Sequence, residues 1–144
     1  MSRRRFRIAD IAQQVVGGFL LAGPFVVTEE VWVLAANMAW YHAVAVAAIV
    51  FAIGYGALYK ADDDRDPDRE AEVGGIPLRF VSLIAVSYLS VLILALSFDA
   101  PATLIPNHVE GPISFRDQVY ITLKAMSVGA VFSVIGAATA DSIY

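Results

Sequence analysis

The sequence VVGGFLLAGPFVVTEEVWVLAANMAW, residues 15–40, decides the fold of this chain. It is a long apolar segment that is interrupted by Pro24 and by two adjacent glutamates, Glu29 and Glu30. No lysine or arginine occurs between Arg7 and Lys60, and this span is long enough to cross a bilayer twice at about 20 residues per crossing. The segment therefore predicts membrane-spanning helices, with two carboxylates close to the hydrocarbon layer.

The composition of the whole chain agrees with this prediction. Its 144 residues are 58% hydrophobic, and the mean hydropathy of +0.66 is too high for an ordinary soluble domain of this length. We expect an all-α, multi-pass protein of the cell membrane, a single domain over residues 1–144 whose surroundings are the lipid bilayer. The absence of cysteine excludes disulfides and thiolate metal sites. Nucleic-acid binding is disfavoured, because the one compact basic patch, residues 3–7, adjoins a membrane segment.

Four crossings are predicted, at about residues 8–33, 40–59, 78–98 and 119–139, with no β-sheet. An acidic inner loop, residues 61–75, and an outer loop, residues 99–117, connect them. The acidic loop fails as a calcium loop, since the required glycine and glutamate are replaced by Arg69 and Gly75, and a solvated connector is expected. In the outer loop, His108 and Glu110 lack the further ligands that a metal site gathers, so no metal is expected.

Positive charges decide the predicted orientation, because cytoplasmic loops are enriched in lysine and arginine. With the N-terminus inside, the outer segments hold only Arg116, with Lys124 close by in the fourth crossing. The inner segments hold Arg3, Arg4, Arg5, Arg7, Lys60, Arg65, Arg69 and Arg79. Both termini are therefore predicted to be cytoplasmic.

Small residues predict where the helices pack closely. Gly17 and Gly18 give the first crossing a thin face, and Pro24 should kink the same helix. A longer stripe repeats every four residues along the fourth crossing, at Ala125, Gly129, Ser133 and Ala137. The serines of the third crossing, Ser87, Ser90 and Ser97, share one arc, and either line a pore or bond to a helix backbone.

Glu29, Glu30 and Lys124 form the candidate ion or proton site. Ionisable side chains inside a membrane are costly, and where they occur they mark functional sites by default. Glu29 lies eleven residues after Gly18 and so shares its face of an unbroken helix. We expect one glutamate to be buried against a neighbouring helix and the other to reach water. Lys124 lies at a similar depth, and either pairs with a glutamate or extends its amine to the surface.

The first crossing resembles the opening signature of an uncharacterised prokaryotic family of integral membrane proteins, with archaeal and bacterial representatives. The matching residues are Gly17, Gly18, Pro24, Thr28, Glu30 and Trp32. The resemblance implies the membrane class and the location of a site. It implies no activity, because the function of that family is not established.

Two functions remain open. No hydrolase, phosphate-loop or dinucleotide motif is present, and His42 and His108 have no serine or cysteine partner nearby, so neither an enzyme nor a cofactor is indicated. The first hypothesis is an oligomeric ion or proton channel, or a small transporter, with its pathway formed between identical subunits. The second is a non-transporting scaffold or accessory subunit. Transport is favoured because the carboxylates follow a proline break, as at the ion sites of interrupted helices.

Overall fold

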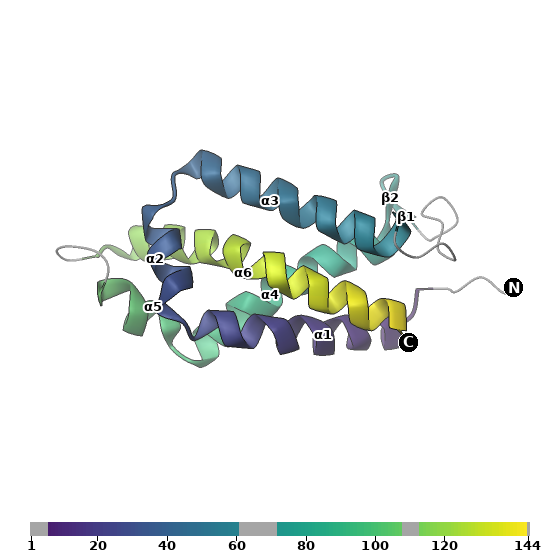
Figure 1. Cartoon of the computed structure of the whole chain (residues 1–144), viewed down its shortest axis with the longest axis horizontal. Coiled ribbons are helices and arrows are strands. Elements are labelled where there is room, and N and C mark those ends of the chain that lie inside the picture. The colour runs from purple at the N-terminus through teal and green to yellow at the C-terminus, as the bar shows by residue number, and fades with distance from the viewer. Residues whose placement is uncertain (1–5, 61–71, 108–112, 144) are drawn as a thin grey trace, which may run out of the picture.

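The computed structural model describes residues 6–60, 72–107 and 113–143. Within them, four helices are long and apolar enough to cross a membrane, and this confirms the predicted all-α, four-span membrane class. They are α1 (Ile8–Val26), α3 (Trp40–Tyr55) with its π-helical continuation η1 (Gly56–Lys60), α4 (Leu78–Ser97) and α6 (Phe115–Ile143). The helices run side by side, and α1 begins at the end of the bundle where α6 finishes, here called the termini end (Figure 1). The opposite end is called the α2 end.

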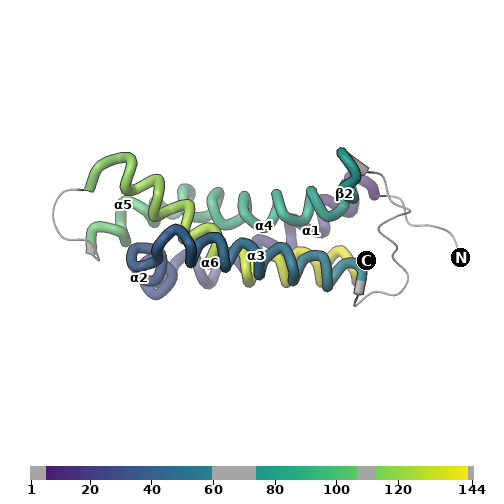
Figure 2. Tube along the Cα trace, turned by 90° about the horizontal axis from the view of Figure 1, so that it is seen from above, coloured from purple at the N-terminus to yellow at the C-terminus, as the bar shows by residue number. Residues whose placement is uncertain are grey.

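The last helix, α6, is the centre of the bundle. It contacts α1, α3 and α4. Inside the chain, 72% of its apolar span is buried, compared with 17–28% for the other three spans. Figure 2 shows α6 crossing the bundle obliquely, from the side of α4 to the side of α3. A central helix of this kind needs small residues, because every face must let a neighbouring helix approach.

The first predicted crossing is two helices rather than one. The predicted C-terminal boundary of the first crossing, residue 33, is wrong, because α1 ends at Val26 and a separate helix, α2 (Glu29–Asn37), follows. Pro24 lies in the last turn of α1, where it removes the backbone donor to the carbonyl four residues earlier and so weakens this end of the helix. Two side chains then satisfy carbonyls at the break: Thr28 Oγ1 donates to Phe25 O at 2.9 Å, and the indole of Trp32 donates to Val26 O at 2.9 Å.

Short helices cover the α2 end of the bundle. The predicted outer loop contains α5 (Ala100–Leu104) and a 3₁₀ turn, η3 (Ile105–Asn107), and α6 already begins at Phe115. Figure 1 shows α2 and α5 together at this end. Trp32, Ala100 and Ile105 are buried in one apolar cluster with residues of α1, α4 and α6. The α2 end is therefore closed by packed apolar side chains.

Among the described residues, a short β-hairpin lies at the termini end. Strands β1 (Glu72–Val73) and β2 (Ile76–Pro77) pair antiparallel, which corrects the prediction of no β-sheet. Gly74 and Gly75 join them at φ of 60° and 85°, values that glycine adopts readily and other residues rarely. The rest of the acidic loop, residues 61–71, lies outside the described residues, as do His108 and Glu110.

The predicted small residues lie at contacts within the chain. Gly17 meets Gly136 and Ala140 of α6, while a Cβ added to Gly129 would lie 2.9 Å from Val91 of α4. Ser133 Oγ donates to Gly18 O at 3.1 Å, joining α6 to α1. The other two members of the stripe, Ala125 and Ala137, are also buried.

The serines of α4 bond to their own helix. Ser87, Ser90 and Ser97 each donate to the carbonyl four residues earlier, at 2.6 Å. Of the two alternatives left open by the sequence, backbone bonding is the one the structure shows.

Candidate functional site

Glu29 and Glu30 are both exposed in the single chain, so the prediction that one is buried is wrong here. They are the first two residues of α2, where the helix dipole favours negative charge. The break at residues 27–28 gives α2 its own axis, and Glu29 therefore does not continue the face of Gly18. These carboxylates occupy a surface of the α2 end.

Lys124 has partners that the sequence did not indicate. Its side chain is buried in α6, and its amine donates to the carbonyl of Met38, the C-cap residue of α2, at 2.7 Å. The amine also lies 4.5 Å from the centre of the Tyr120 ring. A cation at a helix C-terminus is favourable, and this one fixes the corner between α2 and α3 on α6. Lys124 therefore neither extends to the surface nor takes a glutamate as its bonded partner.

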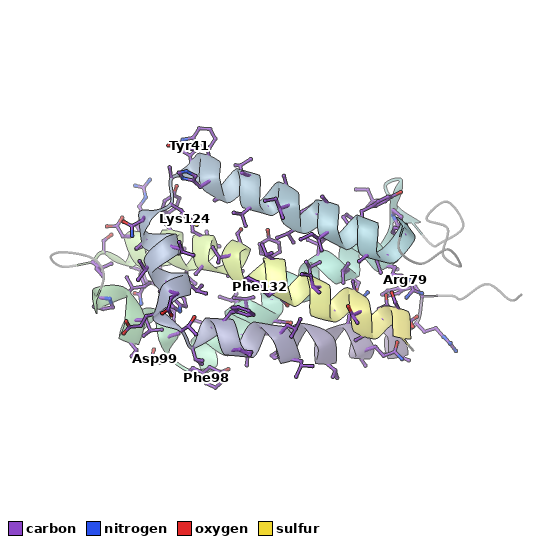
Figure 3. All side chains as sticks on the ribbon, in the orientation of Figure 1. Tyr41, Arg79, Phe98, Asp99, Lys124 and Phe132 are labelled. Carbon is purple, nitrogen blue, oxygen red and sulfur yellow. The ribbon has the colours of Figure 1, made fainter. Side chains whose placement is uncertain are left out.

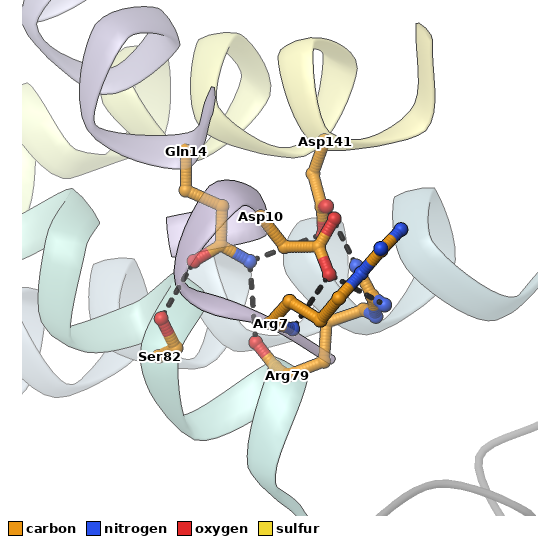
Figure 4. A network of polar contacts seen from close by, with 6 residues as sticks. All are labelled: Arg7, Asp10, Gln14, Arg79, Ser82 and Asp141. Atoms are coloured by element: carbon orange, nitrogen blue, oxygen red, sulfur yellow. Dashed lines mark hydrogen bonds and ion pairs between the residues drawn. The ribbon is translucent and has the colours of Figure 1, made fainter. Parts of the chain in front are cut away.

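A second group of buried charges lies at the termini end, far from Lys124 (Figure 3). Arg79 of α4 is held between Asp10 of α1 and Asp141 of α6, a trio here called the charged cluster (Figure 4). Arg79 Nη1 lies 2.6 Å from Asp141 Oδ1, and Arg79 Nη2 lies 3.4 Å from Asp10 Oδ2. The side chains of Arg79 and Asp141 are 0% exposed and that of Asp10 is 5% exposed.

Gln14 connects the charged cluster to the interior of the bundle. The hydroxyl of Ser82 donates to Gln14 Oε1 at 2.7 Å. The amide nitrogen of Gln14 then faces two acceptors, Asp141 Oδ2 at 3.1 Å and Arg79 O at 3.4 Å. Since only the NH₂ group can donate to both, the orientation of the amide is fixed. Every polar atom of this fully buried side chain has a partner.

Local structure explains how each charge reaches the cluster. Asp10 lies in the first turn of α1, where its Oδ2 accepts the backbone N–H of Arg7 at 2.8 Å. Arg79 is the second residue of α4, and its guanidinium lies 5.2 Å from the centre of the Phe6 ring. Asp141 belongs to the last turn of α6. Two helix starts and one helix end thus meet at the termini end.

Polar contacts continue from the cluster toward the middle of the bundle. Ser90 of α4 and Ser133 of α6 converge on Gly18, where an added Cβ would lie 2.9 and 3.2 Å from their hydroxyl oxygens. Gly18 is eight residues after Asp10, or roughly 12 Å along the helix. We call this series the polar column; its members are Asp10, Gln14, Gly18, Arg79, Ser82, Ser90, Ser133 and Asp141.

The polar column ends near the middle of the bundle. Toward the α2 end, Ala22, Val91, Ala95 and Ala125 are buried in one apolar cluster, and the buried polar side chains of α6 in this half are Thr122, Lys124 and Ser127. At roughly 30 Å of hydrocarbon thickness, the column covers less than half of the span. It leads inward from the termini end and stops.

Sequence reasoning missed the charged cluster, because each member has an ordinary explanation alone. In the sequence, Asp10 is explained as an acidic residue in the first turn of a helix, and Arg79 as one of the positive charges on the cytoplasmic side. Asp141 falls beyond the predicted end of the fourth crossing. The ion pairs join residues 69 and 62 positions apart. A usable signal was present in the topology, since the starts of the first and third crossings and the end of the fourth share one side of the membrane.

Comparison with family models gives one match over nearly the whole chain. Residues 2–143 match the family described as "Putative integral membrane protein (DUF2391)". The chain belongs to this family. No curated protein and no solved structure matches the chain. For this member of the DUF2391 family, the charged cluster lies entirely within the matched residues.

Proposed function

We propose that this DUF2391 member is a small ion or proton transporter whose site is the charged cluster with the polar column above it. One observation carries the proposal: two carboxylates and a guanidinium are buried between three apolar helices. Burying charge is expensive, and well-packed apolar residues of similar volume often hold such an interface at least as well. Charges kept at that cost mark ion and proton pathways in membrane proteins.

The shape of the polar column supports a carrier rather than an open pore. Its polar groups begin at the termini end, while the α2 half of the same interface is packed with Ala22, Val91 and Ala125. An ion bound in the column would have access from one side in this conformation. Passage to the α2 end would then need α1, α4 and α6 to shift against one another.

The competing function is the non-transporting scaffold or accessory subunit. The same contacts also support this function, because Arg79 of α4 pairs with Asp10 of α1 and Asp141 of α6 and so holds the three helices together. If the charged cluster only stabilises the helix packing, its removal should lower the free energy of unfolding and leave any ion flux unchanged. Flux and stability measured on the same variants therefore separate the two functions.

The experiment is flux into liposomes that contain the purified protein, with protons, Na⁺ and K⁺ tested separately. We expect Asp10→Asn to abolish the flux of the transported ion. Glu29→Gln and Glu30→Gln are the matched controls, since both carboxylates are exposed and should leave the flux unchanged. If flux is lost in the glutamate variants and retained in Asp10→Asn, the transport site lies at the start of α2 and not at the charged cluster. Absence of flux for all three ions would favour the scaffold.

We also propose that the protein forms a homo-oligomer through α3, with both termini cytoplasmic. Only 17% of the α3 span is buried in the single chain, the smallest share of the four. Ala48 and Ala52 are exposed, and a Cβ added to Gly56 would meet nothing within 4 Å. Small residues at four-residue intervals let a second helix approach closely. By contrast, the small-residue stripe of α6 is already occupied within the chain.

A further inference from the structure

We infer that the charged cluster is a proton-binding site, and that Asp10 Oδ1 is the atom that receives the proton. This inference names the ion of the proposed transport site. Only the role of the bound proton in transport rests on the proposed function. It starts from a difference between the two carboxylates that share Arg79.

Asp141 is held on both of its oxygens. Oδ1 lies 2.6 Å from Arg79 Nη1, and Oδ2 accepts the amide of Gln14 at 3.1 Å. Its side chain is 0% exposed, and charge-assisted hydrogen bonds are short and stronger than bonds between neutral groups. Asp141 is therefore fixed as the permanent partner of the guanidinium.

Asp10 is held on one oxygen only. Its Oδ2 accepts the Arg7 backbone N–H at 2.8 Å and lies 3.4 Å from Arg79 Nη2. Within the part of the chain that the structure describes, no contact involves Oδ1 of Asp10. The side chain keeps 5% of its surface exposed at the termini end. Asp10 thus offers an oxygen that a proton can reach while the ion pair between Arg79 and Asp141 stays in place.

The donors around the cluster favour a proton over a metal cation. Arg79 and the amide of Gln14 both direct N–H groups toward the carboxylates, and a metal ion placed there would face these hydrogens. The amide oxygen of Gln14, Oε1, is already bonded to Ser82. In the described residues, no group of three or more His, Cys, Asp or Glu side chains is arranged to hold a metal. A proton needs a single oxygen, whereas Ca²⁺ and Mg²⁺ need about six or more.

Proton binding changes the charge balance of the cluster in a defined way. One O–H bond forms at Asp10 Oδ1 and one O–H bond of a hydronium ion at the termini end breaks, which leaves a water molecule behind. Among the described residues, the charged groups that face Asp10 are Arg79 from α4 and, across the shared guanidinium, Asp141 from α6, while Arg7 contributes its backbone N–H. Neutral Asp10 loses most of its attraction for Arg79, which stays on Asp141. Protonation therefore loosens the start of α1 from α4 while α4 remains joined to α6.

The test is infrared difference spectroscopy of the purified protein on acidification, because a buried protonated carboxyl has a C=O stretch separate from those of exposed acids. We expect such a band in the wild type, its loss in Asp10→Asn, and its retention in the control Asp99→Asn. The side chain of Asp99 is exposed, and its backbone φ is 56°, a left-handed conformation that asparagine also adopts. Should Asp10→Asn fail to fold, Asp10→Glu keeps a carboxyl and should move the band rather than remove it. A band that persists unchanged in the Asp10 variants and vanishes in Asp141→Asn would overturn the assignment.

Liposome flux separates failure of this inference from failure of the proposed function. An Asp10-dependent band without ion flux would uphold the proton site and refute transport. Flux of Na⁺ or K⁺ that requires Asp10, with no such band, would uphold transport and refute the proton site. Proton flux together with the band, both lost in Asp10→Asn, supports both.

Discussion

Gly17 of α1 and Gly136 of α6 meet backbone to backbone. A Cβ added to either glycine would fall on the carbonyl oxygen of the other, so the contact is reciprocal. Ala140 of α6 adjoins it, 2.7 Å from the position of a Cβ on Gly17. The crossing lies between the polar contacts of Gln14 and those of Gly18, and it sets how closely the first and last helices approach.

Gly17→Ala and Gly136→Ala should each destabilise the protein by about 1–3 kcal/mol, because the added methyl group collides with backbone that has little freedom to move. Gly23→Ala is the matched control: its Cβ would lie 4.0 Å from the nearest side chain, that of Leu94. Alanine is the better helix former, so this control should be neutral or slightly stabilising. Thermal unfolding in detergent measures all three. Equal unfolding temperatures for Gly17→Ala and Gly23→Ala would contradict the close crossing.

Arg79→Gln should destabilise the protein by about 3–5 kcal/mol, because it leaves two carboxylates buried without their cation. The triple variant Asp10→Asn, Arg79→Gln, Asp141→Asn should recover much of this loss, since no uncompensated charge remains. The free energy of unfolding in mixed micelles is the measurement. A triple variant less stable than Arg79→Gln would show that the charges themselves hold the helices.

Trp32→Phe should cost about 1–3 kcal/mol, because the Val26 carbonyl at the end of α1 loses its indole donor inside the bundle. Trp32 is 1% exposed, whereas Trp40, the other tryptophan, is 66% exposed. Trp40→Phe is therefore the matched control and should change the unfolding temperature little. An equal effect of the two substitutions would mean that the indole bond contributes nothing at the helix break.

Single cysteines report the orientation, because the natural chain has none. We expect Cys at Ile76, exposed in the β-hairpin, to be shielded from an impermeant thiol reagent added outside intact cells. Cys at Ala102, exposed in α5 at the other end, should be labelled. The reverse pattern would place both termini outside.

A cysteine at Ala52 should form a cross-linked dimer under mild oxidation in native membranes, if α3 is the face between identical subunits. Leu89→Cys is the control, because this side chain is 49% exposed on a different helix, α4. Cross-linking at Leu89 but not at Ala52 would move the interface to α4. Cross-linking at neither position would count against an oligomer built on α3.

Hydropathy predicted the four spans because each is a continuous apolar segment, a property that needs no knowledge of neighbours. The first boundary was wrong because Pro24 was expected to kink a helix that in fact ends two residues later. Whether the helix ends after Pro24 or continues depends on partners for the carbonyls of its last turn. Here one partner is Trp32, which can reach Val26 only after the chain has turned.

The sequence directs attention to the two glutamates, which interrupt an apolar segment, and not to the members of the charged cluster, which do not stand out in it. Glu29 and Glu30 interrupt an apolar segment, yet they lie on the surface of a short helix. Asp10 and Asp141 lie near opposite ends of the sequence and share Arg79 only in the folded bundle. Such a pairing depends on helix packing, which hydropathy does not report.

The central position of α6 has a consequence for biosynthesis, because α6 follows the other three spans in chain order. Domains and segments emerge from the ribosome N-terminal end first, so α1, α3 and α4 enter the membrane before the helix that they surround. During that interval Arg79 has Asp10 available but not Asp141, and Gln14 lacks one of its two acceptors. The early helices therefore carry unsatisfied polar groups until α6 arrives, and the arrival of Asp141 completes the polar contacts that the first helices leave open.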